Sequence, residues 1–224
     1  MLHYFKSQFC ISKNNMKQKL NLETWNRKEH FKFFNQFEEP FFGVTVEIDC
    51  TKAYLKCKQS GVSFFTFYLY KTMIAVNQTE NFRYRIQENE VYMYDKINVS
   101  STVLRDDFTF GFSLIEFDVD ILAFSKNVNT EIERVKNTSG LFTRDFPSVN
   151  LIHFSTLPWI NFTSFSHARS FTFEDSCPKI SFGKMEISAN GKRTFSMSVH
   201  VHHGLMDGYH VGKFVDLFQN LMNN

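Results

Sequence analysis

The chain lacks the segments that would place it in a membrane or mark it for export. Its 224 residues contain no apolar run close to the ~20 residues that a membrane-spanning helix needs. Residues 1–19 contain no continuous apolar stretch of the kind found in a secretory signal. We therefore expect a soluble, cytoplasmic protein that makes no membrane contact.

Cysteine is sparse and follows no pattern. The chain has 4 cysteines, which form no Cys-x-x-Cys pair and are too thinly spread for a small disulfide-stapled domain: Cys10, Cys50, Cys57 and Cys177. We expect them to be reduced thiols, as in a cytosolic protein.

Motifs for nucleotide and nucleic-acid binding are absent as well. No Gly-x-Gly-x-x-Gly or Gly-Lys-Ser/Thr segment is present, which argues against a Rossmann or P-loop site. Lys and Arg total 25 against 23 Asp and Glu, and the basic residues are scattered along the chain. Nothing therefore indicates a nucleic-acid partner. Any cofactor must bind through another kind of surface.

The chain is instead rich in residues that build a core. Hydrophobic residues make up 43% and charged residues 21%, and 28 residues are Phe. A chain of this length and composition can bury a substantial core as a single domain. Because no repeat or linker divides it, we predict one domain over 21–224, preceded by a polar, frayed extension at 1–20.

Hydrophobic periodicity predicts both strands and helices, in an order without a regular βα repeat. Alternation of apolar and polar residues predicts strands at 42–48, 83–86, 91–94, 99–104, 109–114, 151–155, 180–185 and 194–201. Helical spacing predicts a helix that Thr24 caps, one at 50–59 that Asp49 caps and Gly61 ends, and others at 62–76, 121–140 and from about 207. The predicted fold class is α+β, a two-layer sandwich of a mixed β-sheet covered by helices.

Residues 199–210 carry the strongest chemical signal. His203 lies where a predicted strand passes into a loop, which gives an imidazole a fixed anchor and an open side, as a general base requires. Asp207 either orients this histidine or pairs with a distant cation and holds the loop. Two alternatives remain: neighbouring histidines that only end a strand, and a zinc site, for which no Cys or Glu lies at ligand spacing.

A second segment, 154–165, places a serine near a sheet edge. Ser155 ends a predicted strand that Pro158 prevents from continuing. Such a serine is most often a turn residue. No Gly-x-Ser-x-Gly surrounds it, so nothing marks it as a nucleophile.

Three separated segments resemble the chloramphenicol acetyltransferases. Residues 202–208, His-His-Gly-Leu-Met-Asp-Gly, are similar to the His-His-x-x-x-Asp-Gly signature of the coenzyme A-dependent acyltransferases, which also include the 2-oxoacid dehydrogenase acyltransferases and peptide-synthetase condensation domains. Residues 155–165 resemble the Ser-x-Leu-Pro-Trp-x-x-Phe element of the chloramphenicol enzymes. Residues 25–33 resemble their N-terminal segment, a Trp followed by Arg and then Glu-His-Phe. The likeness covers nearly the whole chain from about Leu22.

The resemblance implies a role for each matching residue. His203 would be the general base that takes the proton of a substrate hydroxyl, which then attacks the thioester of acetyl-CoA directly, without an acyl-enzyme. Ser155 would donate a hydrogen bond to the oxyanion of the tetrahedral intermediate. Asp207 would form a structural salt bridge with Arg27. Ser181 matches a family threonine that orients a water near the intermediate. No metal takes part.

The same resemblance implies a pocket and an assembly. The aromatic residues Phe33, Phe110, Phe142 and Phe165 fall at positions that line the antibiotic site, although each of them could equally be core. Lys184 matches a lysine near the phosphate end of coenzyme A. The family forms homotrimers with each active site at a subunit interface, so we expect self-association, with the base from one chain and much of the pocket from its neighbour.

Three residues depart from the family pattern. Phe34 stands where many members have a tyrosine, and His167 and Arg169 fall where apolar pocket residues are common. The predicted function is inactivation of chloramphenicol by acetyl-CoA-dependent acetylation of its 3-hydroxyl, and hence antibiotic resistance. The departures touch the acceptor pocket and leave the acetyl-transfer residues intact. The alternatives are a same-mechanism enzyme for another small alcohol and a non-catalytic ligand-binding relative.

Overall fold

The computed structural model describes residues 17–146 and 148–224. Its helices are α1 (Lys28–Phe34), α2 (Thr51–Ser60), α3 (Phe64–Gln78), α4 (Ile121–Lys136) and α5 (Gly208–Asn223), with a 3₁₀ turn η1 (Glu80–Arg83). Its strands are β1 (Lys17–Lys19), β2 (Phe41–Asp49), β3 (Tyr84–Gln87), β4 (Glu90–Tyr94), β5 (Asn98–Leu104), β6 (Phe110–Phe112), β7 (Leu151–Thr156), β8 (Lys179–Phe182), β9 (Glu186–Ile187) and β10 (Arg193–His202). Within the described residues, no helix is long and apolar enough to cross a membrane.

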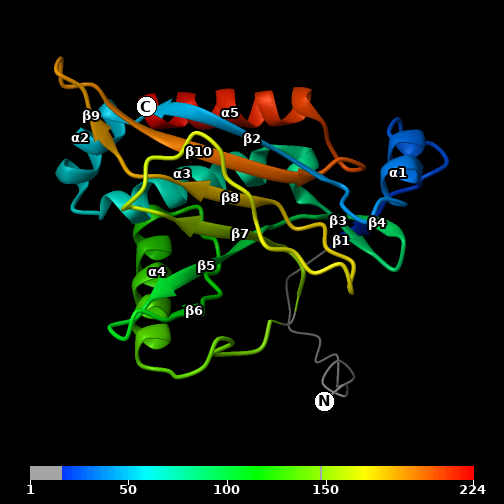
Figure 1. The fold of residues 1–224 in the computed structure, drawn as a ribbon, viewed down its shortest axis with the longest axis horizontal. Helices are drawn as coiled ribbons and strands as arrows, with labels where there is room; N and C mark the ends of the chain where they lie inside the picture. Colours follow the sequence, from blue (N-terminus) through cyan, green and yellow to red (C-terminus); the bar gives the residue numbers. More distant parts are fainter. Residues whose placement is uncertain (1–16, 147) are drawn as a thin grey trace.

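One large sheet organises the molecule. Its strands follow the order β2-β10-β8-β7-β5-β6, with β9 paired to β10. The β5-β7-β8 pairs are parallel and the others antiparallel, so the sheet is mixed. Helices α3 and α5 lie behind it in Figure 1, and α1 stands at one end beside a small sheet of β1, β4 and β3. The predicted α+β sandwich is confirmed.

The alternation along β10 decides which side chains reach the core. Phe195, Met197, Val199 and Val201 are buried, and the Phe195 ring lies 5.5 Å from the Tyr68 ring of α3. The intervening residues point to the opposite side. The segment between β7 and β8, yellow in Figure 1, crosses this second side of the sheet. We call this side the polar face, because polar residues occupy it: His153, Ser155, Lys179, Ser181, Ser196, Ser198, His200 and His202. The chemistry of the chain gathers on this face.

Most predicted elements are present, and their ends follow capping rules. Gly61 closes α2 with φ 69°, and the Ser63 hydroxyl caps α3 by accepting from the Thr66 amide at 3.1 Å. The predicted cap at Asp49 is one residue early: Cys50 is the N-cap of α2, and the Asp49 carboxylate accepts from the Thr51 amide at 2.9 Å.

The predicted cap at Thr24 is wrong. Helix α1 begins only at Lys28, with Arg27 at its N-cap, and the Thr24 hydroxyl donates to the Asn21 carbonyl instead. Turns occupy residues 22–24 and 26–27. The Arg27 side chain extends into the site described below, where it contacts Asp207 and the His203 carbonyl.

The N-terminal extension is shorter than predicted at its inner end. Lys17–Lys19, which the sequence placed in the frayed segment 1–20, form β1 and pair antiparallel with β4. Lys19 also forms a 3.0 Å ion pair with Glu90, and the Lys17 ammonium lies 4.2 Å from the Tyr92 ring centroid. A short edge strand of polar residues has no hydrophobic pattern to reveal it. The remaining residues, 1–16, lie outside the described part of the chain.

Candidate active site

His203 is fixed in place at the end of β10. Its amide donates to the Pro40 carbonyl at 2.8 Å, which ties the start of the turn to the chain just before β2. Its ring stacks on Phe34, with ring centroids 3.9 Å apart and planes 7° apart, and lies 4.6 Å from the Phe42 ring. The Nδ1 atom is buried without a hydrogen-bond partner among the described residues. An imidazole gripped on its faces in this way keeps one orientation.

Arg27 and Asp207 hold the backbone that carries this histidine. Arg27 is only 6% exposed, and its guanidinium donates to the Asp207 carboxylate at 2.8 Å and to the His203 carbonyl at 3.0 Å. The predicted pair between Arg27 and Asp207 is therefore present. Of the two roles considered for Asp207, the geometry favours the second, because its carboxylate grips Arg27 and not the His203 ring.

Asp207 also starts the last helix. One carboxylate oxygen accepts from the Tyr209 amide at 3.1 Å and lies 2.8 Å from Nδ1 of His210. Partial burial raises the pKa of Asp207, but hydrogen bonds from Arg27 and His210 outweigh it and lower the pKa to about 2. The carboxylate is thus charged at any ordinary pH, and the sequence prediction of a helix start at Asp207 or Gly208 is confirmed.

His202 has a structural role next to the candidate base. It is 3% exposed, and its Nδ1 accepts from the Gly204 amide at 3.1 Å. A Cβ on Gly204 would come within 3.1 Å of the His202 ring and 3.3 Å of the Phe31 backbone, so the tight turn has little room for a side chain there. Asn81 completes the turn by donating to the Leu205 carbonyl at 3.0 Å.

A second candidate centre is a pair of serines on the polar face. Ser155 on β7 and Ser181 on β8 are register partners, and their hydroxyl oxygens lie 2.6 Å apart. Ser181 is fully buried, whereas Ser155 is half-buried and has an open side. A hydroxyl held by a neighbouring hydroxyl is a preorganised hydrogen-bond donor, which is what a developing oxyanion needs.

The two centres are far apart within one chain. Ser155 pairs with Ser181, which pairs with Ser198 on β10. His203 comes five residues after Ser198, and at about 3.3 Å per residue this places it about 16 Å further along the strand. A hollow of about 540 Å³ near the start of α5, lined in part by Tyr209, His210 and Lys213, contains neither residue.

The predicted pocket aromatics lie in separate places. Phe33 on α1 is 58% exposed, and Phe142 is 69% exposed. Phe110 and Phe142 flank Phe112, with ring centroids 5.5 and 5.3 Å from it. Phe165 is half-buried in the segment that crosses the polar face. Among the described residues, no ring–ring contact joins Phe33, Phe165 and the pair of Phe110 and Phe142.

Lys184, the predicted coenzyme contact, is exposed just beyond the end of β8. Its amide donates to the Ile160 carbonyl at 2.8 Å, which fixes its backbone near the turn after β7. Its ammonium forms no hydrogen bond or ion pair among the described residues. It is therefore free to meet a charged ligand.

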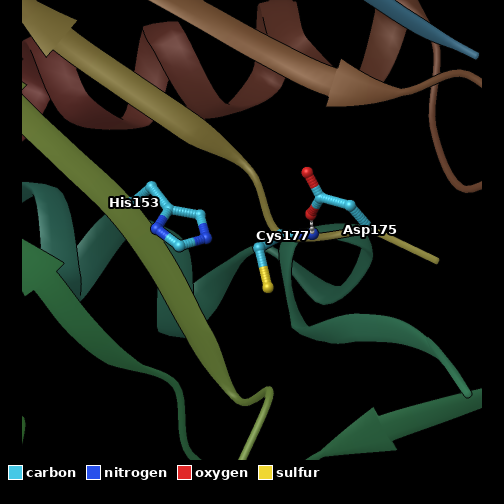
Figure 2. A group of neighbouring side chains, drawn as sticks. All are labelled: His153, Asp175 and Cys177. Carbon is cyan, nitrogen blue, oxygen red and sulfur yellow. Dashed lines mark hydrogen bonds between the residues drawn. The ribbon is translucent and has the colours of Figure 1, made fainter. Parts of the chain in front are cut away.

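One group of potential metal ligands lies beside the serine pair. Figure 2 shows His153, Asp175 and Cys177, whose ligand atoms all lie within 4.8 Å of one another. Both Asp175 oxygens already have partners: the Cys177 amide at 3.0 Å and the Lys179 ammonium at 2.7 Å. Burial raises the pKa of the Cys177 thiol, which disfavours the thiolate that a metal would bind. The cluster favours an ion pair, and the absence of a catalytic metal stays a prediction.

Several residues of the site carried no signal in the sequence. The Phe42 ring reads as ordinary strand core, yet it contacts the candidate base, and Asn81 lies on a distant turn. Phe34 was noted only as a departure from tyrosine, and its stacking depends on a helix docked from far away in the chain. Contacts of this range follow from tertiary packing, and local pattern cannot reveal them.

Comparison with known sequences identifies a family to which the chain is similar. A family model described as chloramphenicol acetyltransferase matches residues 15–219. The chloramphenicol acetyltransferase 3 of Escherichia coli is 30% identical over 208 residues, which cover 92% of this chain and 97% of that protein. The chloramphenicol acetyltransferase of Staphylococcus aureus is 31% identical over 208 residues, with coverage of 91% and 95%.

Solved structures extend the likeness to the fold. A chloramphenicol acetyltransferase superposes with a TM-score of 0.81 at 28% identity, covering 92% of this chain and 100% of that one. The truncated catalytic core of the 2-oxoacid dehydrogenase multienzyme complex from Thermoplasma acidophilum, at 15% identity, shares the fold, with a TM-score of 0.63 and coverage of 89% and 95%. On the family model and these relatives, the chain belongs to the chloramphenicol acetyltransferase family.

Proposed function

We propose that the chain acetylates the 3-hydroxyl of chloramphenicol with acetyl-CoA and so confers resistance to this antibiotic. Membership in the family makes it an acyltransferase that uses acetyl-CoA. The observation that carries the proposal is His203, stacked on Phe34 at the end of β10 and tied through its own carbonyl to Arg27. We place the enzyme in the cytoplasm as a soluble protein, in line with the reduced thiols expected from its sequence.

In the proposed reaction, His203 acts as general base. It takes the proton of the 3-hydroxyl while the hydroxyl oxygen bonds to the acetyl carbonyl carbon. The carbonyl becomes an oxyanion, which the Ser155 hydroxyl stabilises; such a contact is worth about 3 kcal/mol in the transition state. The intermediate then collapses as the carbon–sulfur bond breaks, and His203 returns its proton to the coenzyme A sulfur.

The active site forms between copies of the chain in a homotrimer. Support comes from the distance along the sheet between His203 and Ser155, which is too great for one acetyl group to contact both in a single chain. Large apolar side chains also stand exposed near the predicted pocket, as in surfaces that pack against a partner: Phe33, Phe110 and Phe142. In the trimer the base of one copy faces the serines of the next.

Each copy contributes residues to the coenzyme side and to the acceptor side of the substrate sites. Lys184, exposed beyond the end of β8, binds the phosphate end of the coenzyme. The four aromatic residues predicted from the sequence, Phe33, Phe110, Phe142 and Phe165, line the acceptor side across the interface. Ser181 supports the oxyanion donor directly, through its 2.6 Å contact with Ser155, in addition to the water-orienting role predicted for it.

The test follows thiol release from acetyl-CoA with a chromogenic disulfide, with and without chloramphenicol, on protein whose mass in solution has been measured. We expect a trimer whose thiol release depends on the antibiotic, with 3-acetylchloramphenicol as the product. A folded protein that releases no thiol with chloramphenicol would refute this acceptor. A monomer with full activity would refute the shared site.

A further inference from the structure

A row of histidines lies directly beside the serine pair on the polar face. His153 precedes Ser155 by two residues on β7, and Lys179 precedes Ser181 by two on β8. His153 and Lys179 are register partners, and Lys179 also pairs with His200 on β10. Residues two apart on a strand share one face of the sheet. The row next to the serines is therefore His153, Lys179 and His200.

The segment that crosses the polar face adds a fourth member. The His167 ring lies 4.9 Å from the His200 ring, at 84°, and 4.7 Å from the Phe165 ring. We call His153, Lys179, His200 and His167 the histidine row. Because Phe165 is one of the aromatics proposed to line the acceptor pocket, the row and that pocket are contiguous.

The direction of β8 places the row on the acceptor side. Lys184, proposed to bind the phosphate end of the coenzyme, follows Ser181 along the chain, whereas Lys179 precedes it. The acetyl group being transferred lies at the serine pair, between the two. A ligand on the Lys179 side of Ser155 is consequently the acceptor.

Ion pairs of Lys179, a member of the row, and of the neighbouring Arg169 balance the charge there. The Lys179 ammonium contacts Asp175 at 2.7 Å, and Arg169 pairs with Glu39 and lies 3.6 Å from Asp175. The side chains of Lys179 and Arg169 are only 8% and 7% exposed. Two positive and two negative charges thus cancel, which leaves no net charge to attract an anionic acceptor.

The imidazoles themselves are neutral hydrogen-bonding groups. Burial, with His200 and Lys179 nearby, lowers the pKa of His167 to about 4, and burial also lowers the pKa of His200. Nε2 of His167 is buried without a hydrogen-bond partner among the described residues. A neutral imidazole offers one donor and one acceptor, so hydroxyl or amide groups can pair with it, whereas an aryl ring would leave it unsatisfied.

We propose that the histidine row forms an acceptor subsite that selects neutral, hydroxyl-rich acceptors, so that the enzyme also acetylates small neutral glycosides. This inference rests on the proposed site, with its base and serine pair, and names a further substrate class for it. The chemistry is the same acetyl transfer. The new carbon–oxygen bond forms on a glycoside hydroxyl, the thioester carbon–sulfur bond breaks, and the hydroxyl proton passes through His203 to the coenzyme A thiol.

The experiment compares three acceptors in the thiol-release assay: chloramphenicol, a neutral alkyl glucoside and an anionic hydroxy acid of similar size. It uses the wild type, His167→Leu, His167→Gln and a matched control, Gln78→Leu, which makes a similar polar-to-apolar change at an exposed site remote from the polar face. For His167→Leu we expect KM for the glucoside to rise about tenfold and KM for chloramphenicol to fall, with kcat little changed. His167→Gln keeps the hydrogen-bonding groups and should stay near the wild type, as should Gln78→Leu.

The outcomes separate this inference from the proposed function. Turnover of chloramphenicol without any turnover of the glucoside, or equal effects of His167→Leu on both acceptors, overturns the inference and leaves the proposed function standing. Glucoside turnover without chloramphenicol turnover supports the inference and refutes the proposed acceptor. Preference for the anionic hydroxy acid over the glucoside overturns the inference that the subsite selects neutral acceptors. No thiol release with any of the three from folded trimer refutes both.

Discussion

The two centres on the sheet differ in how the chain holds them. At the His203 end, contacts within one chain hold the side chain and its backbone in place. Aromatic rings pack against the imidazole, and Arg27 donates hydrogen bonds to both the His203 carbonyl and the Asp207 carboxylate. At the serine end, Ser155 and Ser181 hold each other, but the histidines beside them include His153, which is exposed. The first centre is built to keep one geometry, and the second to receive a ligand.

Removing the proposed base is the strongest test of this difference. We expect His203→Ala to lower kcat by roughly 10²–10⁴-fold, the usual contribution of a positioned general base, because no other residue reaches that position. The mass in solution should match that of the wild type, since the His203 backbone contacts to Pro40 and Arg27 do not need the ring. The measurement is kcat by thiol release alongside the mass in solution. Near wild-type turnover would remove His203 from the mechanism.

Loss of the proposed oxyanion donor, Ser155, tests the other centre. We expect Ser155→Ala to lower kcat by about 10²–10³-fold with little change in KM, because the contact strengthens only in the transition state. Ser181→Ala should cost less, since Ser155 keeps its hydroxyl and loses only the 2.6 Å support. Steady-state kinetics of both variants check the order. A larger fall in kcat for Ser181→Ala than for Ser155→Ala would mean that Ser181 is the main oxyanion donor.

Breaking the clamp at the His203 end tests whether it acts on stability. We expect Arg27→Ala to reduce the free energy of unfolding by about 3 kcal/mol, because the Asp207 carboxylate loses a buried partner. Activity should fall with it, since the His203 carbonyl loses its donor as well. Urea unfolding of Arg27→Ala, Asp207→Asn and the double variant measures the coupling. Additive losses would mean that the two residues act independently.

The sequence predicts the elements of the fold better than it predicts the contacts made at the two centres. The sheet, the buried α3 and the helix start at Asp207 follow from local period and capping, and the Arg27–Asp207 pair followed from family resemblance. The stacking of Phe34 on His203 and the alignment of Lys179 between two histidines depend on strand register and on a docked helix. Strand register depends on packing throughout the core, so it cannot be predicted from a short stretch of sequence. Thr24 failed as a cap because its hydroxyl donates to the Asn21 carbonyl within a turn, and α1 begins only at Lys28.

The pH dependence of stability distinguishes two groups, His167 in the histidine row and Asp207 beside His203. His167 has a folded pKa of about 4, below the ordinary value of 6.5, so the unfolded state binds more protons between these values. The contribution of His167 to the free energy of unfolding is fully present above about pH 6.5 and is lost as the pH falls toward 4. The pKa of Asp207 is about 2 against an ordinary 3.8, so its contribution is lost only between about pH 4 and pH 2.

Chemical unfolding of the protein at pH 8, 5 and 3 tests this order. We expect His167→Gln to be relatively more stable than the wild type at pH 5 by about 1 kcal/mol, a small value because the ring is partly exposed to screening solvent. Asp207→Asn should destabilise at pH 8 and 5 and converge on the wild type as the carboxylate protonates. If His167→Gln instead changes stability equally at all three pH values, the imidazole is not held neutral. His167 would then lack the neutral imidazole that the proposed acceptor subsite requires.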